Sequence, residues 1–333
     1  MPKRKTRFAL FLVASLCHLG TAAKLVAAEE KERQFSDWSE PVNLGPVLNS
    51  QGRDFNNQHP AISKNGLSLY FVSNRPGGFG NNDIWVSQRS RIHAPWGPPQ
   101  NLGPTINTPS NDFAPNLTPD GHWLYFNSNR PGGCGLGDLY VSHRQNTRDD
   151  FAWEPPMNLG CQINTEFAET APNYFADEET DITSLYFSSD RPGGLADFDI
   201  YVSTLQEDGR FGPGVLVREL SSPFMDVRTA IRSDGLEFFL TSDRPDGRIG
   251  ALDIWVSTRE STRDRWSTPV NVGPTVNSPY VQGGPALSHD GTTMYFYSNR
   301  PGSFGANDLY VTTRTELCGD NHHNEGSGDN QCE

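Results

Sequence analysis

One short motif returns five times along this chain. Each copy has Ser, then Asn or Asp, then Arg-Pro and a Gly-containing corner, and it continues to an Asp that opens an apolar run. The copies span residues 73–87, 128–142, 189–203, 242–257 and 298–312, and their arginines lie 55, 61, 53 and 56 residues apart. A repeat of this period is typical of propellers and solenoids, in which each unit buries its apolar faces against its neighbours.

Each unit contains four segments in the same order. In the first unit these are PAIS (60–63), LYFVS (69–73), DIWVS (83–87) and a W-x-x-P-x-N-L-G segment (96–103). Short runs of β-branched and aromatic residues, bounded by Asn, Asp, Gly and Pro, predict strands joined by turns. We find no long helical period after residue 28, and we therefore expect an all-β fold.

The order of segments at the two ends predicts a closed ring. The chain opens with a lone fourth segment (38–45) and finishes on a third segment (308–314). The opening strand would complete the last sheet through backbone hydrogen bonds, which leaves no free end. We predict a five-bladed β-propeller with four-stranded antiparallel blades, closed in this way. An open solenoid, the alternative, would need capping units, and none is visible.

The repeat is similar to a known family pattern. S-[ND]-R-P-G-G followed by D-[IL]-[YW]-V-S, and preceded by D-G-x-x-L-Y-F, resembles the WD40-like (PD40) β-propeller repeat of TolB-type periplasmic and exported proteins. The similarity covers residues 38–314. It implies a propeller fold and protein contacts in the cell envelope.

The first residues have the features of an export signal. A basic start (3–7), an apolar run (8–16) and small residues before Glu29 predict cleavage after Ala28. The apolar run is too short to span a bilayer, and no later segment has the length of a transmembrane helix. We expect a periplasmic or secreted protein. Lipid anchoring at Cys17 is the less favoured alternative, because the preceding Leu fits a lipobox poorly.

These features divide the chain into four parts. We assign residues 1–28 to the signal peptide, 29–37 to a linker, 38–314 to the propeller and 315–333 to a polar tail. Lys and Arg number 27 against 40 Asp and Glu, for a formal charge of −13. Signal cleavage would remove five basic residues and no acidic one, leaving −18. Such a surface repels nucleic acid, and we expect a monomer.

Two cysteines depart from the repeat in the same unit. Cys134 replaces the Phe of G-G-F-G, and Cys161 replaces the Pro of N-L-G-P. We predict that they form a disulfide, because an oxidising compartment lets cysteines pair. Cys318 and Cys332 would close the tail as a second loop. Free buried thiols are the alternative.

The recurring motif places an Arg at the end of one strand and an Asp at the start of the next. We expect the two side chains to face each other across the hairpin. The pairs are Arg75 with Asp83, Arg130 with Asp138, Arg191 with Asp199, Arg244 with Asp253, and Arg300 with Asp308. A catalytic pair is needed once per active site, whereas this pair occurs in every unit. We therefore interpret it as structural.

Function is expected where equivalent positions differ between units. Three residues before the first-segment Pro, or its equivalent Thr229, the units carry Asn57, Asp112, Glu169, Asp226 and Gln282. This position precedes the innermost strand, so we expect it to line a mouth of the central channel and to contact a ligand or partner. The three carboxylates also suggest a Ca²⁺ site or a carboxylate pair for glycoside hydrolysis. Solvated loop groups that hydrogen-bond between blades are the interpretation that we favour.

The fourth unit departs most from the pattern. It lacks the Trp, the N-L-G and the Pro, and it carries Arg218, Glu219, Met225, Asp226 and Arg228. A specialised contact face and simple drift both remain open.

No familiar catalytic motif accompanies the repeats. The sequence contains no Gly-x-Ser-x-Gly elbow, Walker loop, His-Glu-x-x-His or Cys-x-x-Cys. We therefore favour a non-catalytic module that binds or scaffolds a protein partner in the envelope or outside the cell, with no assigned catalytic residue, metal ligand or cofactor. The alternative is a carbohydrate-binding or glycoside-acting propeller that uses the carboxylates at the channel mouth.

Overall fold

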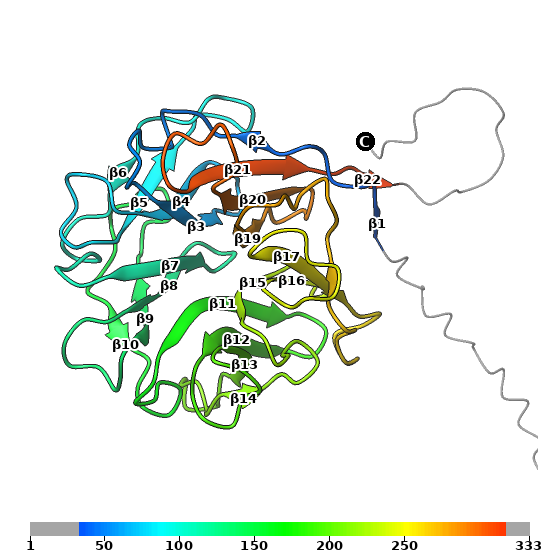
Figure 1. Cartoon of the computed structure of the whole chain (residues 1–333). Helices are drawn as coiled ribbons and strands as arrows, with labels where there is room; N and C mark the ends of the chain where they lie inside the picture. Colours follow the sequence, from blue (N-terminus) through cyan, green and yellow to red (C-terminus); the bar gives the residue numbers. More distant parts are fainter. Residues whose placement is uncertain (1–32, 318–333) are drawn as a thin grey trace, which may run out of the picture. The chain divides into compact units, whose positions relative to one another are not determined.

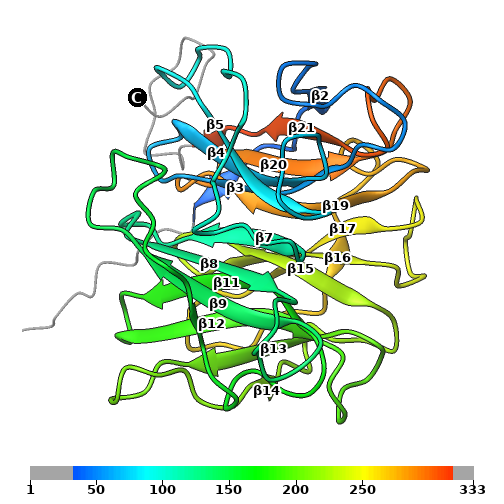
Figure 2. The same cartoon turned by 90° about the vertical axis from the view of Figure 1, so that its left-hand side faces the viewer.

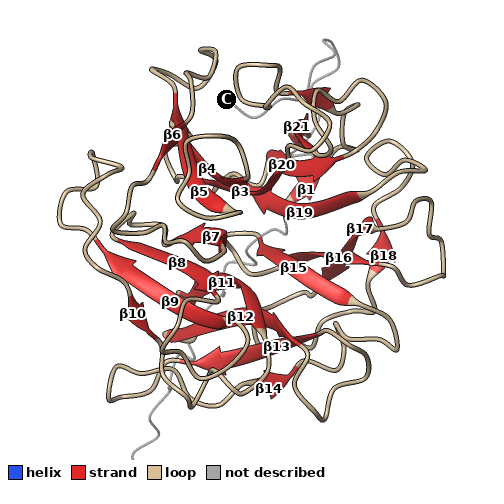
Figure 3. Cartoon of the chain, turned by 60° about the vertical axis from the view of Figure 1, so that its left-hand side comes forward, coloured by secondary structure: helices blue, strands red, loops and turns tan. Residues whose placement is uncertain are grey.

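The computed structural model describes residues 33–317, which form a ring of five four-stranded antiparallel sheets (Figure 1). The predicted five-bladed β-propeller is confirmed. Within the described stretch every regular element is a strand (Figure 3). No helix in this stretch has the length and apolar character required to cross a membrane.

The strands of each blade follow one another in chain order. Blade 1 contains β3 (Asn57–Ile62), β4 (Ser68–Ser73), β5 (Asp83–Gln88) and β6 (Gln100–Asn101). Blade 2 contains β7 (Asp112–Leu117), β8 (Trp123–Ser128), β9 (Asp138–His143) and β10 (Met157–Asn158). Blade 3 contains β11 (Glu169–Asp177), β12 (Ile182–Ser189), β13 (Asp199–Thr204) and β14 (Val215–Leu216). Blade 4 contains β15 (Asp226–Ile231), β16 (Glu237–Ser242), β17 (Asp253–Thr258) and β18 (Val270–Asn271). Blade 5 contains β19 (Gln282–Leu287), β20 (Thr293–Ser298) and β21 (Asp308–Thr313), with β2 (Val42–Asn43) as its fourth strand.

The first strand of every blade lies next to the central axis. β3, β7, β11, β15 and β19 contact one another around the ring, and Figure 1 shows them near the centre, with β6, β10 and β14 at the rim. Each fourth strand pairs over only two residues, which is shorter than the W-x-x-P-x-N-L-G segment that predicts it.

The ring closes as the order of segments predicts. β2 pairs with β21 in the register Val42 with Val311 and Asn43 with Tyr310 (Figures 1 and 2). A second pair of strands lies just outside the propeller boundaries that we assigned. β1 (Gln34–Phe35) pairs with β22 (Glu316–Leu317), so residues of the linker and the tail fasten the two ends together.

The apolar cores lie between neighbouring blades. Tyr70 and Ile84 of blade 1 belong to one buried cluster with Phe126 and Trp153 of blade 2. Trp153 comes from the W-x-x-P segment of blade 2, and its ring meets that of Tyr70 edge-on, with the ring centres 6.4 Å apart. The recurring Trp therefore seals one blade against the blade before it. A single sheet could not bury these faces alone.

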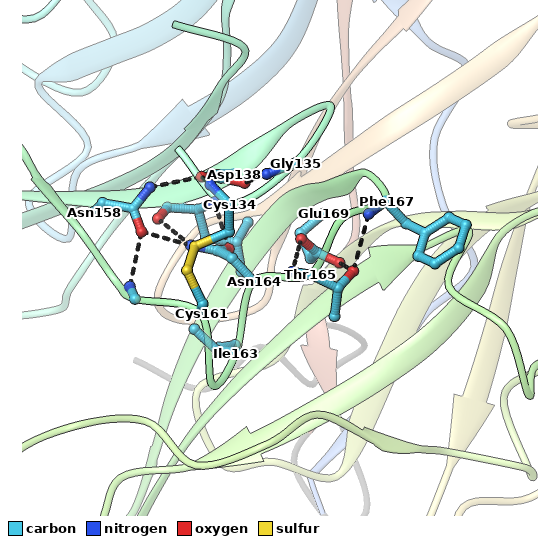
Figure 4. Close-up of a disulfide and its surroundings, with 12 residues drawn as sticks. Cys134, Gly135, Asp138, Asn158, Cys161, Ile163, Asn164, Thr165, Phe167 and Glu169 are labelled. Atoms are coloured by element: carbon cyan, nitrogen blue, oxygen red, sulfur yellow. Dashed lines mark hydrogen bonds between the residues drawn. A yellow bond between two sulfur atoms is a disulfide. The ribbon is translucent and has the colours of Figure 1, made fainter. Parts of the chain in front are cut away.

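The predicted disulfide between Cys134 and Cys161 is present (Figure 4). The two Cα atoms are 5.6 Å apart, and the bond ties the loop between β8 and β9 to the loop that follows β10. The second predicted pair, Cys318 with Cys332, lies outside the described residues. The export signal (1–28) and Cys17 also lie outside them.

Candidate functional site

The hairpin arginines do not pair with the aspartates that we expected. Arg130 Nη2 donates to Asp112 Oδ1 at 2.6 Å, and Arg191 Nη2 donates to Glu169 Oε1 at 2.9 Å. In each case the partner is the first residue of the innermost strand of the same blade. Arg244 pairs in the same way with Asp226. Arg75 Nη2 donates to the Asn57 amide oxygen at 2.6 Å. Arg300 has no such partner among the described residues and donates instead to the Val276 carbonyl and the Ser298 hydroxyl.

The direction of the guanidinium has a local cause. Arg130 Nε donates to the Ser128 hydroxyl at 3.0 Å, and its guanidinium carbon lies 5.2 Å from the Phe126 ring centre and 4.8 Å from that of Tyr140. These contacts hold the side chain over its own sheet and aim it toward the axis, away from Asp138.

The expected partner aspartates hold the hairpin turn instead. Asp138 accepts hydrogen bonds from the Cys134 and Gly135 amides at 2.5 and 3.1 Å, and from the Asn158 side chain at 2.7 Å (Figure 4). These donors satisfy the Asp138 carboxylate without a contact to Arg130. Asp83, Asp199, Asp253 and Asp308 make the same contacts with their own turns.

The candidate binding residues do not line an open channel mouth. Asn57, Asp112, Glu169, Asp226 and Gln282 all have no exposed surface. Each bonds through its side chain within its own blade, and its backbone amide donates to the preceding blade, as Asp112 N does to Asn82 O at 2.9 Å. Asp112, for example, accepts from Arg130 and from the Thr108 amide at 2.6 Å. Burial raises the pKa of Asp226, against the opposing effect of Arg244. None of them lines the cavity on the axis of the ring, and our expectation that they contact a ligand stays a prediction.

The same burial argues against the two sharper hypotheses for these carboxylates, a Ca²⁺ site and a carboxylate pair for glycoside hydrolysis. Asp112, Glu169 and Asp226 lie in three different blades, and each is engaged by its own arginine. Among residues 33–317 no group of three or more His, Cys, Asp or Glu side chains is placed to hold a metal ion. A water-activating carboxylate pair also needs access to substrate, which these residues lack.

A cavity of about 340 Å³ lies on the axis, between the five innermost strands. It is lined by residues 59–62, 114–117, 171–175, 228–231 and 284–287. Residues of the following turns also line it, among them Lys64, Asp120, Glu178 and His289. Small-molecule sites in proteins have volumes of about 300 to 1,000 Å³, so this cavity is of sufficient size.

Each innermost strand bulges at the same point where it passes the cavity. The register of β3 against β4 shifts between Gln58 and Ala61, and the other four blades shift at the equivalent place. The bulged residue has a positive φ in every blade: His59 (48°), Ala114 (49°), Ala171 (51°), Arg228 (58°) and Gly284 (61°). Non-glycine residues seldom adopt this conformation, and bulges are frequent beside functional sites.

Two asparagines present free polar groups to the cavity. The Asn116 side-chain oxygen accepts from the Tyr174 amide at 2.9 Å, and its NH₂ group has no partner among the described residues. Asn173 donates to the Thr229 carbonyl at 3.1 Å, which leaves its own side-chain oxygen without one in the same stretch. The site therefore offers a donor and an acceptor from adjacent blades.

Three further cavity residues carry buried polar atoms without a partner. Within the described part of the chain these atoms are His59 Nε2, Arg228 Nη1 and Thr229 Oγ1. The His59 ring lies against Phe113 and Tyr297, with ring centres 4.7 and 5.9 Å away. Burial, together with the nearby Arg228 charge, holds the pKa of His59 well below its ordinary value. Burial lowers the pKa of Arg228 to about 10, so it stays charged at neutral pH.

The cavity begins two residues after the position that the repeat pattern indicates. The cavity is lined by the bulged position, where the units carry His59, Ala114, Ala171, Arg228 and Gly284, and by the position two residues further on. Of the polar cavity residues only Arg228 was singled out, as one of several departures in the fourth unit. The Pro that follows the bulged residue in four units is a signal that could have located this position.

Comparison with known proteins shows a shared fold. No protein-family model matches this chain. A search of curated proteins likewise gives no match. Among solved structures, a thermostable family-43 glycoside hydrolase matches with a TM-score of 0.53 and 11% identity, over 86% of this chain and 97% of that one.

Two α-L-arabinofuranosidases give similar values. The enzyme PaAbf62A from Podospora anserina matches with a TM-score of 0.53 and 14% identity, over 84% of this chain and 97% of that one. The enzyme from Lactobacillus brevis matches with 0.53 and 17%, over 88% of this chain and 100% of that one. At these identities the likeness is one of fold.

These comparisons correct our main functional interpretation. We favoured a non-catalytic scaffold with a protein partner, whereas the three matched structures given above are glycoside hydrolases. Of our two interpretations the carbohydrate alternative agrees better with these neighbours, and for this chain it is a proposal. TolB from Acinetobacter baumannii matches with a TM-score of only 0.42. That value is too low to bear on the TolB-type resemblance, which stays a prediction.

Proposed function

We propose that this protein binds a carbohydrate in the central cavity. The observation that carries the proposal is the set of unpartnered polar groups that converge in a cavity of about 340 Å³. A concave site with a few convergent polar groups among apolar residues is the usual arrangement for binding a small ligand. Its polar groups come from different blades, so the closed ring holds them in fixed positions.

The chemistry of the lining fits a sugar. Sugar hydroxyl groups both donate and accept hydrogen bonds, and Asn116 and Asn173 offer one free group of each kind. Between these groups the walls are apolar, with Pro60, Pro115 and Ala230 among the lining residues. Such surfaces can pack against the C–H faces of a pyranose or furanose ring.

The fold neighbours support the same ligand class. PaAbf62A was solved in complex with cellotriose, and a GH62 hydrolase with a TM-score of 0.53 and 14% identity was solved in complex with xylotriose. These oligosaccharides are ligands of those proteins. For this chain they indicate which ligands to test first.

The test is calorimetric titration with xylo-, arabino- and cello-oligosaccharides. We expect at least one series to bind, and we expect Asn116→Ala and Asn173→Ala each to weaken binding about fivefold, since a neutral hydrogen bond contributes about 1 kcal/mol. Gln145→Ala is the control, because Gln145 is exposed and does not line the cavity.

Two results would contradict the proposal. One is a complete absence of binding across the panel by a folded protein. The other is binding that Asn116→Ala and Asn173→Ala leave as strong as in the control variant, because the sugar would then bind elsewhere.

A further inference from the structure

The cavity contains a partly buried arginine that no carboxylate of the described residues neutralises. Arg228 has no carboxylate within 4.0 Å among the described residues, and its Nη1 is buried without a hydrogen-bond acceptor. Its guanidinium carbon lies 5.2 Å from the centre of the Tyr297 ring. The aromatic face offers some attraction to the charge but accepts no hydrogen bond in the plane of the guanidinium.

Three other arginines, whose side chains are buried, pair with carboxylates. Arg144 pairs with Asp150 at 2.7 Å, Arg232 pairs with Glu237 at 2.7 Å, and Arg244 pairs with Asp226. Each of these arginines belongs to the frame of the propeller. Arg75 and Arg300 also lack a carboxylate, but their guanidinium groups donate to backbone carbonyls. The Arg228 guanidinium has neither kind of acceptor among residues 33–317. Its side chain is partly exposed, but its buried Nη1 without an acceptor is unfavourable, and a ligand oxygen would compensate it.

The surroundings of Arg228 show which group would fit. His59 Nε2 and Thr229 Oγ1 line the same cavity, and both lack partners. A guanidinium presents parallel N–H donors whose spacing matches the two oxygens of a carboxylate. The Thr hydroxyl and the imidazole N–H can donate to the same oxygens or to a neighbouring hydroxyl.

The mouth of the cavity limits how much negative charge can enter. Asp120 and Glu178 are exposed there, against the single lysine Lys64. The whole chain is also acidic, with a formal charge of −13. A ligand with one carboxylate can reach Arg228, whereas a polyanion would bring further charges against these acidic residues.

We propose that Arg228 makes the site specific for a sugar that carries one carboxylate, that is, a uronic acid residue. This inference rests on the proposed carbohydrate function and adds the charge of the ligand to it. In the bound state the Arg228 guanidinium faces the uronic carboxylate, and Asn116 and Asn173 contact ring hydroxyl groups. Arg228 is then the residue that separates acidic from neutral sugars.

The matched probes are methyl β-D-glucuronide and methyl β-D-glucoside, which differ only in the carboxylate. We expect the wild-type protein to bind the glucuronide about 10- to 100-fold more tightly than the glucoside, as for a hydrogen-bonded ion pair sheltered from water. Arg228→Gln should remove this preference and bind the two probes equally. Arg248→Gln is the control, because it removes an exposed arginine of the same blade that does not line the cavity.

Thermal unfolding without ligand separates recognition from a structural role. If Arg228 serves the ligand, Arg228→Gln should melt at the wild-type temperature or higher, because a partly buried charge with an unpartnered Nη1 has been removed. A fall in melting temperature together with an unchanged preference for the glucuronide would overturn the inference.

The outcomes also distinguish this inference from the function on which it rests. Equal binding of both probes by the wild-type protein would leave carbohydrate binding intact and refute the role of Arg228. Binding of neither probe, nor of the neutral oligosaccharides, would refute both. Acetate that binds as tightly as the glucuronide would show a simple anion site and would refute the uronic acid inference, while the neutral oligosaccharides would still decide the carbohydrate function.

Discussion

At the scale of single residues, two kinds of partly buried arginine serve different purposes. Arg130 has a carboxylate, a hydroxyl and a carbonyl as acceptors, and it lies over two aromatic rings. Arg228 has an aromatic ring and no carboxylate among the described residues. Since burial without a partner is unfavourable, the first kind stabilises the frame and the second keeps a charge available to a ligand.

His59 should make stability depend on pH. Its pKa is lowered in the folded protein by burial and by Arg228, so the unfolded chain takes up the proton first as the pH falls below about 6.5. The free energy of unfolding should therefore fall with pH below that value, with a slope of up to about 1.4 kcal/mol per pH unit from this residue. Asn tolerates a positive φ, so His59→Asn removes the titration with little added strain.

Urea unfolding at pH 7, 6 and 5 measures this effect. We expect the free energy of unfolding to fall more steeply between pH 7 and pH 5 for the wild-type protein than for His59→Asn. Above pH 7 the difference between the two proteins should be constant. Parallel curves across this range would show that His59 titrates in the folded state as it does in the unfolded state.

At the scale of elements, each hairpin is fastened at two separate points. The Asp at the start of the third strand holds its turn and the Asn of the fourth strand, as Asp138 does with Asn158 at 2.7 Å. The Arg at the end of the second strand holds the start of the first, as Arg130 does with Asp112. In blade 3 the fourth strand has Leu216 where the others have Asn, and Asp199 Oδ1 lacks a partner in the described residues.

Removing the inner fastening of one blade should be costly. Asp112→Ala leaves the largely buried Arg130 without its counter-charge, and we expect the free energy of unfolding to fall by about 3 kcal/mol. Asp246→Ala, at an exposed position of a hairpin loop, should change it by less than about 0.5 kcal/mol. A loss for Asp112→Ala no larger than this control would mean that the pair contributes little. Denaturant unfolding of both variants measures the two free-energy differences.

At the scale of the whole molecule, the ring depends on joining residues far apart in the chain. The cores lie between blades, so blade 5 must be completed before both of its faces are covered. β2 completes it through β21, and Leu44 N donates to Leu309 O at 3.0 Å. The β1–β22 pair and Arg314, whose guanidinium carbon lies 3.8 Å from the centre of the Phe35 ring, reinforce the same junction.

Two matched substitutions separate closure from local packing. Asn43 donates to Asp308 at 2.8 Å at the junction, and Asn101 donates to Asp83 at 2.8 Å inside blade 1. Replacing either with Leu should lower the free energy of unfolding by about 1 to 3 kcal/mol. Only Asn43→Leu should speed hydrogen exchange of the β1, β2 and β22 amides. The reason is that β2, which contains Asn43, pairs with a strand far away in the sequence, whereas β6, which contains Asn101, pairs with a strand of its own unit. Equal exchange in the two variants would argue against a separate closure step.

The sequence by itself determined the number of blades, the order of their strands, the closing strand and the disulfide, because these follow from repeated local patterns and from departures such as Cys134 and Cys161. The partner of each hairpin arginine depended on the tertiary structure. Aromatic contacts aim Arg130 at Asp112, and backbone amides satisfy Asp138. The site was also decided there, because a bulge in each innermost strand brings His59, Asn116, Asn173 and Arg228 to one axis. Residues from four blades converge only when the ring closes, and no local pattern records which positions then face the centre.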